Sequence, residues 1–344
     1  MFDVWYGLLH CIQKHLITNK TTVYFILRDP IYDKGTDKKG DCYMSIIEIN
    51  GLTKDYGNHK GIFDLSFQVK EGEVFGYLGP NGAGKTTTIR HLMGFLSPDK
   101  GTARILGMDC CMESSSIMKE LGYLPAEIAF FDGMNGMEFL KFMGEMRGMR
   151  DNTYRDKLID QFELDTRGRI RKMSKGMKQK LGIICAFMHD PRVLILDEPT
   201  SGLDPLMQRR FAELILEEKA KGKTILMSSH SFEEIERTCD RVGIIRNGNL
   251  VAIEDIHILK EKRRKTYLVT FDRPETALAF QKKDCFDQIS VNGSIAKVSI
   301  LGNVSNLVQE LGQHVVLDLD TENSSLEDVF MQYYGTSNTN TAAK

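Results

Sequence analysis

The pattern of hydrophobic and polar positions is clearest in the middle of the chain. Apolar residues alternate with polar ones over residues 46–52 and 63–69, which predicts two strands with one buried face. Residues 193–196 and 224–227 are continuously apolar and alternate with helical patterns, as expected of buried parallel strands. A further apolar run at residues 74–78 predicts one more short buried strand. We therefore expect an α/β fold.

A helical pattern dominates residues 126–188. Phe139, Phe142, Met143 and Met146 occupy the i, i+3, i+4 and i+7 positions of one helix face. This spacing predicts a helical subdomain.

Residues 1–43 differ from the rest of the chain, because they carry no sustained period and end in a polar run. Residues 38–41 can be encoded by a purine-rich stretch that resembles a bacterial ribosome-binding site, a few codons before Met44. We hypothesise that translation begins at Met44 and that the first 43 residues are read-through of upstream sequence. The alternative is an amphipathic arm, whose apolar face would carry Trp5, Leu8, Leu9, Ile12 and Leu16.

The character of the chain changes again near residue 265. Short strand patterns and a helical stretch near residues 274–280 lead into a polar tail. We therefore expect a main domain over residues 44–260 and a small C-terminal α/β accessory domain over residues 261–344.

Composition narrows the class of protein. A chain of 344 residues is long enough for two domains, and 42% hydrophobic with 27% charged residues is ordinary for a globular protein. The formal net charge of −2 argues against a nucleic-acid partner bound by bulk electrostatic attraction. Seven cysteines without CxxC spacing indicate a reduced cytosolic protein. No stretch reaches the roughly 18 consecutive apolar residues of a membrane span, so a function at a membrane would require a membrane-embedded partner.

Residues 79–86 form a candidate phosphate-binding loop. They satisfy the GxxxxGK[ST] pattern after a predicted strand and before a predicted helix, which is the context the pattern requires. Glycines let backbone N–H groups turn toward phosphate oxygens at the helix N-terminus. Lys85 is expected to reach the β- and γ-phosphates, and the Thr86 hydroxyl to bind Mg²⁺. The whole loop is expected to hold the nucleotide, through Gly79, Pro80, Asn81, Gly82, Ala83, Gly84, Lys85, Thr86 and Thr87.

Two carboxylates follow the apolar run at residues 193–196. Asp197 would lie at the C-terminal edge of its strand, where α/β sheets bind ligands, and is expected to hold Mg²⁺. Glu198 is placed to orient or deprotonate the attacking water. An acidic pair after a strand is more often a simple helix start, so it indicates hydrolysis only in combination with the phosphate-binding loop.

Together with residues 197–205, Asp-Glu-Pro-Thr-Ser-Gly-Leu-Asp-Pro, the loop resembles the ATP-binding cassette (ABC) family over about residues 44–260. The resemblance implies a P-loop NTPase core of ABC type, with an antiparallel β subdomain and a helical subdomain. It also implies ATP and Mg²⁺ as ligands, and catalysis by Lys85, Glu198 and His230.

The resemblance implies roles for further residues. Ser174 and Gly176 match the signature motif, which completes the ATP site of an opposing subunit in a head-to-tail dimer. Asp204 matches the loop that connects the two sites. His230 matches the switch histidine that contacts the γ-phosphate, and Tyr56 matches the aromatic residue that stacks on adenine.

Two positions depart from the family pattern. Lys175 replaces the first glycine of the usual Ser-Gly-Gly, which adds a cation that we expect near the phosphates. Ala126 occupies the slot of the family's magnesium-contacting glutamine, and Glu127 follows it. We expect Glu127 to supply the missing metal ligand.

The Met- and Phe-rich residues 130–137 match the groove that receives a helix of the membrane subunit in this family. For Phe139, Phe142 and Met143, a purely structural role in the helical core is at least as good an interpretation.

The resemblance implies the ATP-hydrolysing subunit of a transporter at the cytoplasmic face of the cell membrane. Its expected partners are a polytopic membrane permease and a second ATP-binding subunit, as a homodimer. Residues 317–319 and 325–330 resemble the extension of bacterial exporter-type ATPases, which points to efflux of drugs, peptides or lipid-like compounds rather than import.

Two other classes fit less well. Soluble ABC ATPases of ribosomes or DNA normally carry two cassettes, or a long coiled coil or zinc module between the loop and the signature. This chain has neither between Lys85 and Ser174. A cassette that only binds nucleotide is disfavoured by the presence of both Glu198 and His230.

Overall fold

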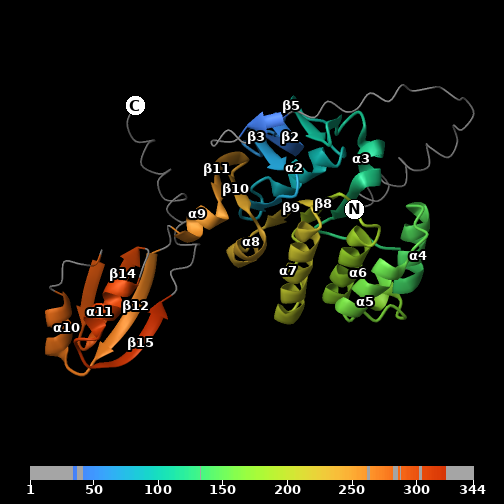
Figure 1. The fold of residues 1–344 in the computed structure, drawn as a ribbon. Coiled ribbons are helices and arrows are strands. Elements are labelled where there is room, and N and C mark those ends of the chain that lie inside the picture. Colours follow the sequence, from blue (N-terminus) through green and yellow to red (C-terminus); the bar gives the residue numbers. More distant parts are fainter. Residues whose placement is uncertain are drawn as a thin grey trace, which may run out of the picture. The chain divides into compact units, whose positions relative to one another are not determined.

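The structure is a computed structural model that describes residues 34–36, 42–131, 133–261, 264–281, 286, 288–301 and 304–322. It divides into two compact units, Met1–Ile253 and Glu254–Lys344 (Figure 1). The hypotheses of an amphipathic arm and of a ribosome-binding site concern residues 1–33 and 38–41, which lie outside the described residues.

The first unit is built on a six-stranded sheet in the order β11-β10-β4-β9-β8-β7. The neighbours from β10 to β7 run parallel. Every residue of β4, β8 and β9 is buried, which agrees with their continuous apolar sequences. The predicted α/β fold is confirmed, with strands β4 (Val74–Leu78), β7 (Leu121–Leu124), β8 (Val193–Asp197), β9 (Thr224–Ser229), β10 (Arg241–Arg246) and β11 (Asn249–Asp255).

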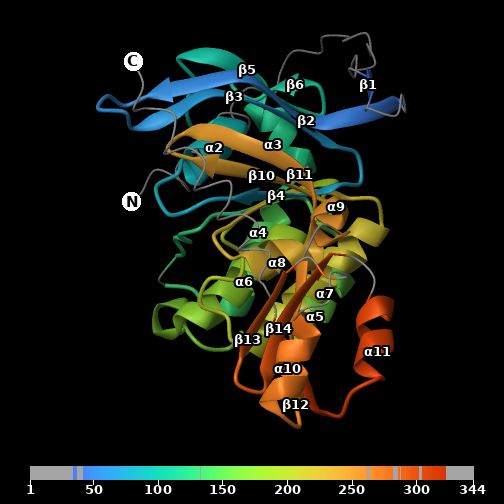
Figure 2. The same cartoon turned by 90° about the vertical axis from the view of Figure 1, so that its left-hand side faces the viewer.

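An antiparallel sheet forms the second layer of this unit, and Figure 2 shows it beside the edge formed by β10 and β11. β2 is its centre, between β3 and β5, with β1 and β6 at the ends. Residues before Met44 take part, since Lys34 pairs with Met44. The strands are β1 (Lys34–Thr36), β2 (Cys42–Asp55), β3 (Gly61–Lys70), β5 (Lys100–Ile105) and β6 (Met108–Asp109).

Helices cover both faces of the six-stranded sheet (Figure 1). α2 (Lys85–Leu92) packs between β8 and the antiparallel strands β3 and β5. α8 (Phe232–Thr238) packs on β4 and β9, and α7 (Pro205–Ala220) packs on α8. α3 (Ser114–Glu120) leads into β7.

The helical subdomain contains α4 (Gly136–Met146), α5 (Thr153–Gln161), the 3₁₀ helix η1 (Ile170–Lys172) and α6 (Lys175–Phe187). Phe139 and Met143 are buried, as the helical spacing predicts. The rings of Phe130 and Phe131 contact α4 edge-on, at 5.1 Å from Phe139 and 5.7 Å from Phe142. The aromatic residues of this segment therefore pack largely on one another.

The second unit has its own sheet and core. Its strands follow the order β13-β14-β12-β15, and all neighbours are antiparallel. With one helix after β12 and one after β14, this is the ferredoxin-like β-α-β-β-α-β arrangement. Its elements are α9 (Ile256–Glu261), β12 (Arg264–Phe271), α10 (Pro274–Gln281), β13 (Gln288–Asn292), β14 (Ile295–Leu301), α11 (Ser305–Leu311) and β15 (Val316–Glu322).

The boundary predicted at residue 260 falls in α9, a few residues after the first compact unit ends at Ile253. The exporter-like residues 325–330 and the polar tail lie outside the described residues. Within the part of the chain that the structure describes, no helix is long and apolar enough to cross a membrane.

Candidate active site

The phosphate-binding loop connects β4 to α2 through backbone conformations that need glycine. Gly84 has a φ of 115°, and a Cβ there would lie 2.7 Å from the Cγ2 atom of Ile62. At Gly79, a Cβ would lie 2.4 Å from the carbonyl oxygen of Ile245. Side chains at these two positions would push the loop away from β3 and β10, so the glycines fix where α2 begins.

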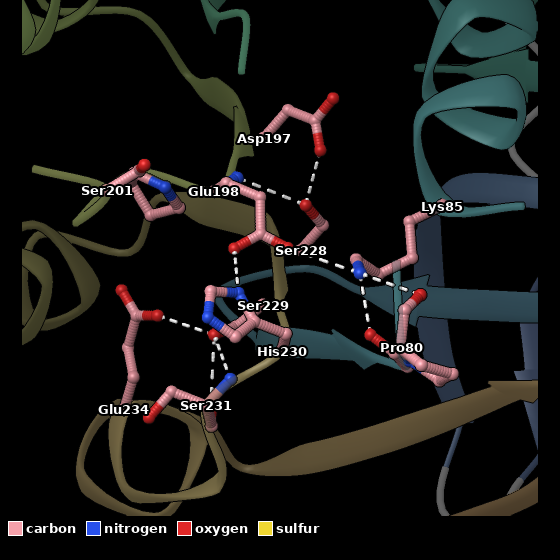
Figure 3. A network of polar contacts seen from close by, with 12 residues as sticks. Pro80, Lys85, Asp197, Glu198, Ser201, Ser228, Ser229, His230, Ser231 and Glu234 are labelled. Atoms are coloured by element: carbon pink, nitrogen blue, oxygen red, sulfur yellow. Dashed lines mark hydrogen bonds and ion pairs between the residues drawn. The ribbon is translucent and has the colours of Figure 1, made fainter. Parts of the chain in front are cut away.

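Lys85 is the first residue of α2 and is only 5% exposed. Its Nζ donates to the carbonyl oxygens of Gly79 at 2.6 Å and Pro80 at 3.3 Å. The same ammonium lies 3.1 Å from Oε1 of Glu198, as Figure 3 shows. The structure thus brings the predicted phosphate-binding cation into contact with the predicted base.

Asp197 ends β8 and is fully buried. Its carboxylate accepts hydrogen bonds from the hydroxyls of Thr86 at 2.9 Å and Ser228 at 2.5 Å. Burial raises the pKa of Asp197, and these two hydrogen bonds act in the opposite direction. The pairing of β8 with β9 places Ser228 directly opposite Asp197.

Thr86 and Asp197 form a set of hard oxygen donors that suits Mg²⁺. In the described ranges, no cluster of three or more His, Cys, Asp and Glu side chains could enclose a metal ion. Mg²⁺ commonly uses one or two protein oxygens and completes its shell with water and substrate phosphates. The residues present therefore fit a phosphate-bound Mg²⁺.

Glu198 is held in a left-handed backbone conformation, with a φ of 51°. Its N–H donates to the hydroxyl of Ser228 at 3.1 Å and to the carbonyl of Ser228 at 3.2 Å. Its Oε2 lies 2.6 Å from Nδ1 of His230, while Oε1 meets Lys85 (Figure 3). Conformations of this kind persist where surrounding contacts enforce them, and they are frequent at active sites.

A cavity of about 1080 Å³ opens beside this cluster. Glu198 and the phosphate-binding loop line one part of it. Tyr56, Lys60 and Phe63 line another part, and Tyr56 is 53% exposed. A space of this size accommodates a nucleotide, with polar groups at the phosphate end and aromatic rings elsewhere.

The sequence of this chain is similar to those of known proteins. The family model described as "ABC transporter" matches residues 62–201. The bacitracin transport ATP-binding protein of Bacillus licheniformis is 35% identical over 300 residues, which is 85% of this chain and 98% of that protein.

The chain belongs to the ABC transporter ATP-binding proteins. The linearmycin resistance ATP-binding protein of Bacillus subtilis is 35% identical over 213 residues, 60% of this chain and 68% of that protein. A solved ATP-binding subunit of an ABC transporter superimposes with a TM-score of 0.58 at 31% identity, covering 63% of this chain and 92% of the other. The predicted family and P-loop fold are thereby confirmed, and with them ATP binding and hydrolysis.

The signature segment of this ABC subunit lies at the start of α6. Ser174 is exposed and caps the helix, accepting from the N–H of Met177 at 3.2 Å. A Cβ at Gly176 would lie 2.9 Å from the carbonyl oxygen of Gly202, so the signature packs closely on its own connecting loop. Ser174 and Gly176 are not part of the cavity lining, and neither is Asp204, which caps α7.

Lys175, the residue that departs from the family pattern, reaches the connecting loop. Nζ of Lys175 donates to the hydroxyl of Ser201 at 3.0 Å. Its aliphatic stem lies over Gly202, where a Cβ would meet it at about 3.0 Å. We expected this charge near the phosphates; within one chain, the structure pairs it with the loop instead.

At the slot of the family's magnesium-contacting glutamine, the first of the two candidate residues lies at the cavity and the second does not. Ala126 lines the cavity, whereas Glu127 is exposed and is not among the lining residues. A metal-binding role for Glu127 therefore requires a movement of this segment and stays a prediction.

Three polar residues of the site were not predicted from the sequence. Ser228 binds both Asp197 and the backbone of Glu198. Gln179 of α6 donates to the carbonyl oxygen of Pro199 at 2.7 Å. Glu234 of α8 binds Ser229, next to His230. The sequence contains one signal for Ser228 and Ser229: the otherwise apolar strand β9 ends in these two polar residues.

Proposed function

We propose that this ABC ATP-binding subunit powers the export of a drug, peptide or lipid-like compound through a separate polytopic membrane subunit. The main support is the length of the similarity to the bacitracin transport protein. An alignment of 300 residues is longer than the first unit, which ends at Ile253, so it includes part of the second unit. The linearmycin resistance protein adds a second relative whose name refers to an antibiotic.

The proposed cycle uses two copies of the chain at the cytoplasmic face of the membrane. Each ATP would lie between the phosphate-binding loop of one copy and Ser174 and Gly176 of the other, near Asp204 of the connecting loop. Tyr56 would stack on the adenine. Dimerisation driven by ATP, and its reversal after hydrolysis, would move the membrane subunit.

Within each site, we assign a separate role to each residue of the chain. Lys85 would neutralise charge on the β- and γ-phosphates, and Thr86 and Asp197 would hold Mg²⁺, which supplies further charge stabilisation when bound. Glu198 would accept the proton of the attacking water. His230 contacts the Glu198 carboxylate at 2.6 Å and would keep that carboxylate oriented.

Glu198→Gln tests the catalytic part of this proposal. Removing the proton acceptor is expected to lower turnover by about 10²-fold or more while ATP binding persists, trapping a nucleotide-bound dimer. ATP hydrolysis, equilibrium ATP binding and size-exclusion chromatography with ATP would be measured. Glu213→Gln, an exposed carboxylate on α7, is the matched control. Monomeric behaviour of the Glu198 variant with ATP would contradict the shared site.

The direction of transport needs a vesicle assay. The chain would be co-expressed with its membrane subunit, and labelled bacitracin would be offered to inverted vesicles. Export predicts ATP-dependent uptake into inverted vesicles, which is lost in the Glu198→Gln variant. Uptake only by right-side-out vesicles that contain ATP would instead identify an importer.

A further inference from the structure

Glu234 connects to both residues that flank His230 in the sequence. It lies in the first turn of α8, and its Oε2 accepts a hydrogen bond from the hydroxyl of Ser229 at 2.6 Å. The same hydroxyl accepts from the N–H of Ser231 at 2.9 Å (Figure 3). One carboxyl group therefore anchors the turn 229–231 that carries His230.

The position of His230 depends on this turn. Its side chain is 62% exposed, so few packing contacts hold the ring. Nδ1 of the ring contacts Oε2 of Glu198 at 2.6 Å. A shift of the backbone at residues 229–231 would consequently move the imidazole away from Glu198.

Glu234 also faces the loop that follows Glu198. A cavity of about 300 Å³ is lined by Thr200, Ser201 and Gly202 on one side and by His230, Ser231 and Glu234 on the other. Burial raises the pKa of Glu234 to about 7, and the hydrogen bond from the hydroxyl of Ser229 opposes this rise. The carboxyl thus hydrogen-bonds Ser229 at the end of β9 and shares this cavity with the segment that follows β8.

We propose that Glu234 is a positioning residue for ATP hydrolysis. Through Ser229 it fixes the turn that presents His230 to Glu198. The proposal rests on the roles proposed above for Glu198 and His230. Among the described residues, Glu234 itself forms no hydrogen bond or ion pair with the phosphate-binding loop or with Lys85, and its carboxylate holds the turn that carries His230, so we expect it to act on turnover more than on ATP affinity.

The test compares steady-state ATP hydrolysis by the full chain with equilibrium ATP binding. In Glu234→Ala, kcat is expected to fall about tenfold or more, as for the loss of a buried hydrogen bond, while KM and the Kd of ATP stay within about twofold. Glu234→Gln keeps an acceptor for Ser229 and is expected to recover most of the lost kcat. Glu233→Ala is the matched control, because this neighbour is exposed and pairs with Arg237 at 3.2 Å on the surface of the same helix.

Three results would overturn the proposal: an unchanged kcat in Glu234→Ala, a loss of ATP affinity as large as the loss of kcat, or equal losses in the Ala and Gln variants. If Glu234→Ala does not fold, Ser229→Ala removes the same hydrogen bond from the other side. A selective loss of kcat in that variant supports the proposal, and an unchanged kcat refutes it.

Glu198→Gln is measured in the same series, so that an error in the proposed catalytic site can be distinguished from an error in the positioning role of Glu234. Full turnover in Glu198→Gln would mean that the proposed catalytic site itself is wrong. If Glu198→Gln loses turnover while the Glu234 and Ser229 variants both keep normal turnover, the proposed catalytic site is supported. Only the positioning role of Glu234 is then refuted.

Discussion

At the residue scale, Glu198 is restrained from three directions. Ser228 binds its backbone N–H, Lys85 meets one carboxylate oxygen and His230 meets the other. These partners come from α2 and from the end of β9, which are far apart in the sequence. If Glu198 is the base, as proposed, a carboxylate held in this way would need no further conformational search before the reaction.

Lys85→Ala should weaken ATP binding. The substitution removes a nearly buried cation from the mouth of the phosphate-binding loop, so the Kd of ATP is expected to rise about tenfold or more. Isothermal titration calorimetry would measure it, with Lys157→Ala as the control because Lys157 is a surface lysine paired with Glu217. An unchanged Kd would refute the phosphate-binding role.

Glu234 should also make stability depend on pH. Burial raises its pKa from an ordinary value of 4.5 to about 7 in the folded chain; among the charged neighbours, Glu198 raises the pKa and His230 lowers it. The folded state therefore holds this proton over a pH range in which the unfolded state releases it. The stabilisation is complete below about pH 4.5 and is lost as the pH rises through about 7.

Urea denaturation of the wild type and Glu234→Gln at several pH values from about 5 to 8 would measure this effect. The unfolding free energy of the wild type should fall relative to the variant as the pH rises, by at most about 1.4 kcal/mol per pH unit. Parallel pH profiles would contradict the raised pKa.

At the scale of elements, α4 begins at a reciprocal capping box. The side chain of Asn135 accepts from the N–H of Glu138 at 2.9 Å, and the Glu138 carboxylate accepts from the N–H of Asn135 at 2.8 Å. This pair fixes the start of the helix that carries Phe139 and Met143 into the helical core.

Asn135→Ala should lower the unfolding free energy by about 1 kcal/mol, since it leaves one helix N–H without its partner. Glu145→Ala is a matched control on the same helix, because Glu145 is exposed and takes no part in the cap. Chemical denaturation would measure both variants. Equal effects of the two substitutions would show that the cap contributes nothing.

At the scale of the whole molecule, each of the two compact units has a hydrophobic core of its own among the described residues. One joins the antiparallel sheet to the six-stranded sheet and α2. The other lies within the second unit and includes Val269, Phe271, Phe280 and Val298. Each core is contributed by one unit, so each unit has its own source of stability.

Phe280→Ala should therefore destabilise the second unit alone. Removing a fully buried phenylalanine costs about 3–5 kcal/mol. Differential scanning calorimetry should show one transition moving down while the other, together with ATP hydrolysis, is preserved. Phe211→Ala, at a fully buried site on α7, is the reciprocal test in the first unit. A single transition that shifts as one would contradict two independent cores.

Local sequence determined much of this protein. Three features could be recognised from neighbouring residues alone: the apolar runs of β4, β8 and β9, the glycines of the phosphate-binding loop and the acidic pair after β8. These features predicted the fold and the ATP site. Sequence patterns of this kind are readable because strand burial and turn conformation are set over a few residues.

Tertiary structure alone decided which groups meet. The pairing of β8 with β9 puts Ser228 opposite Asp197, and the packing of α8 brings Glu234 to the turn of His230. The direction of the Lys175 side chain toward Ser201 was likewise invisible in the sequence. Ser228 is 31 positions from Asp197, and Ser201 is 26 positions from Lys175. The contact of Glu234 depends on how α8 packs on the sheet. No local spacing in the sequence encodes such contacts.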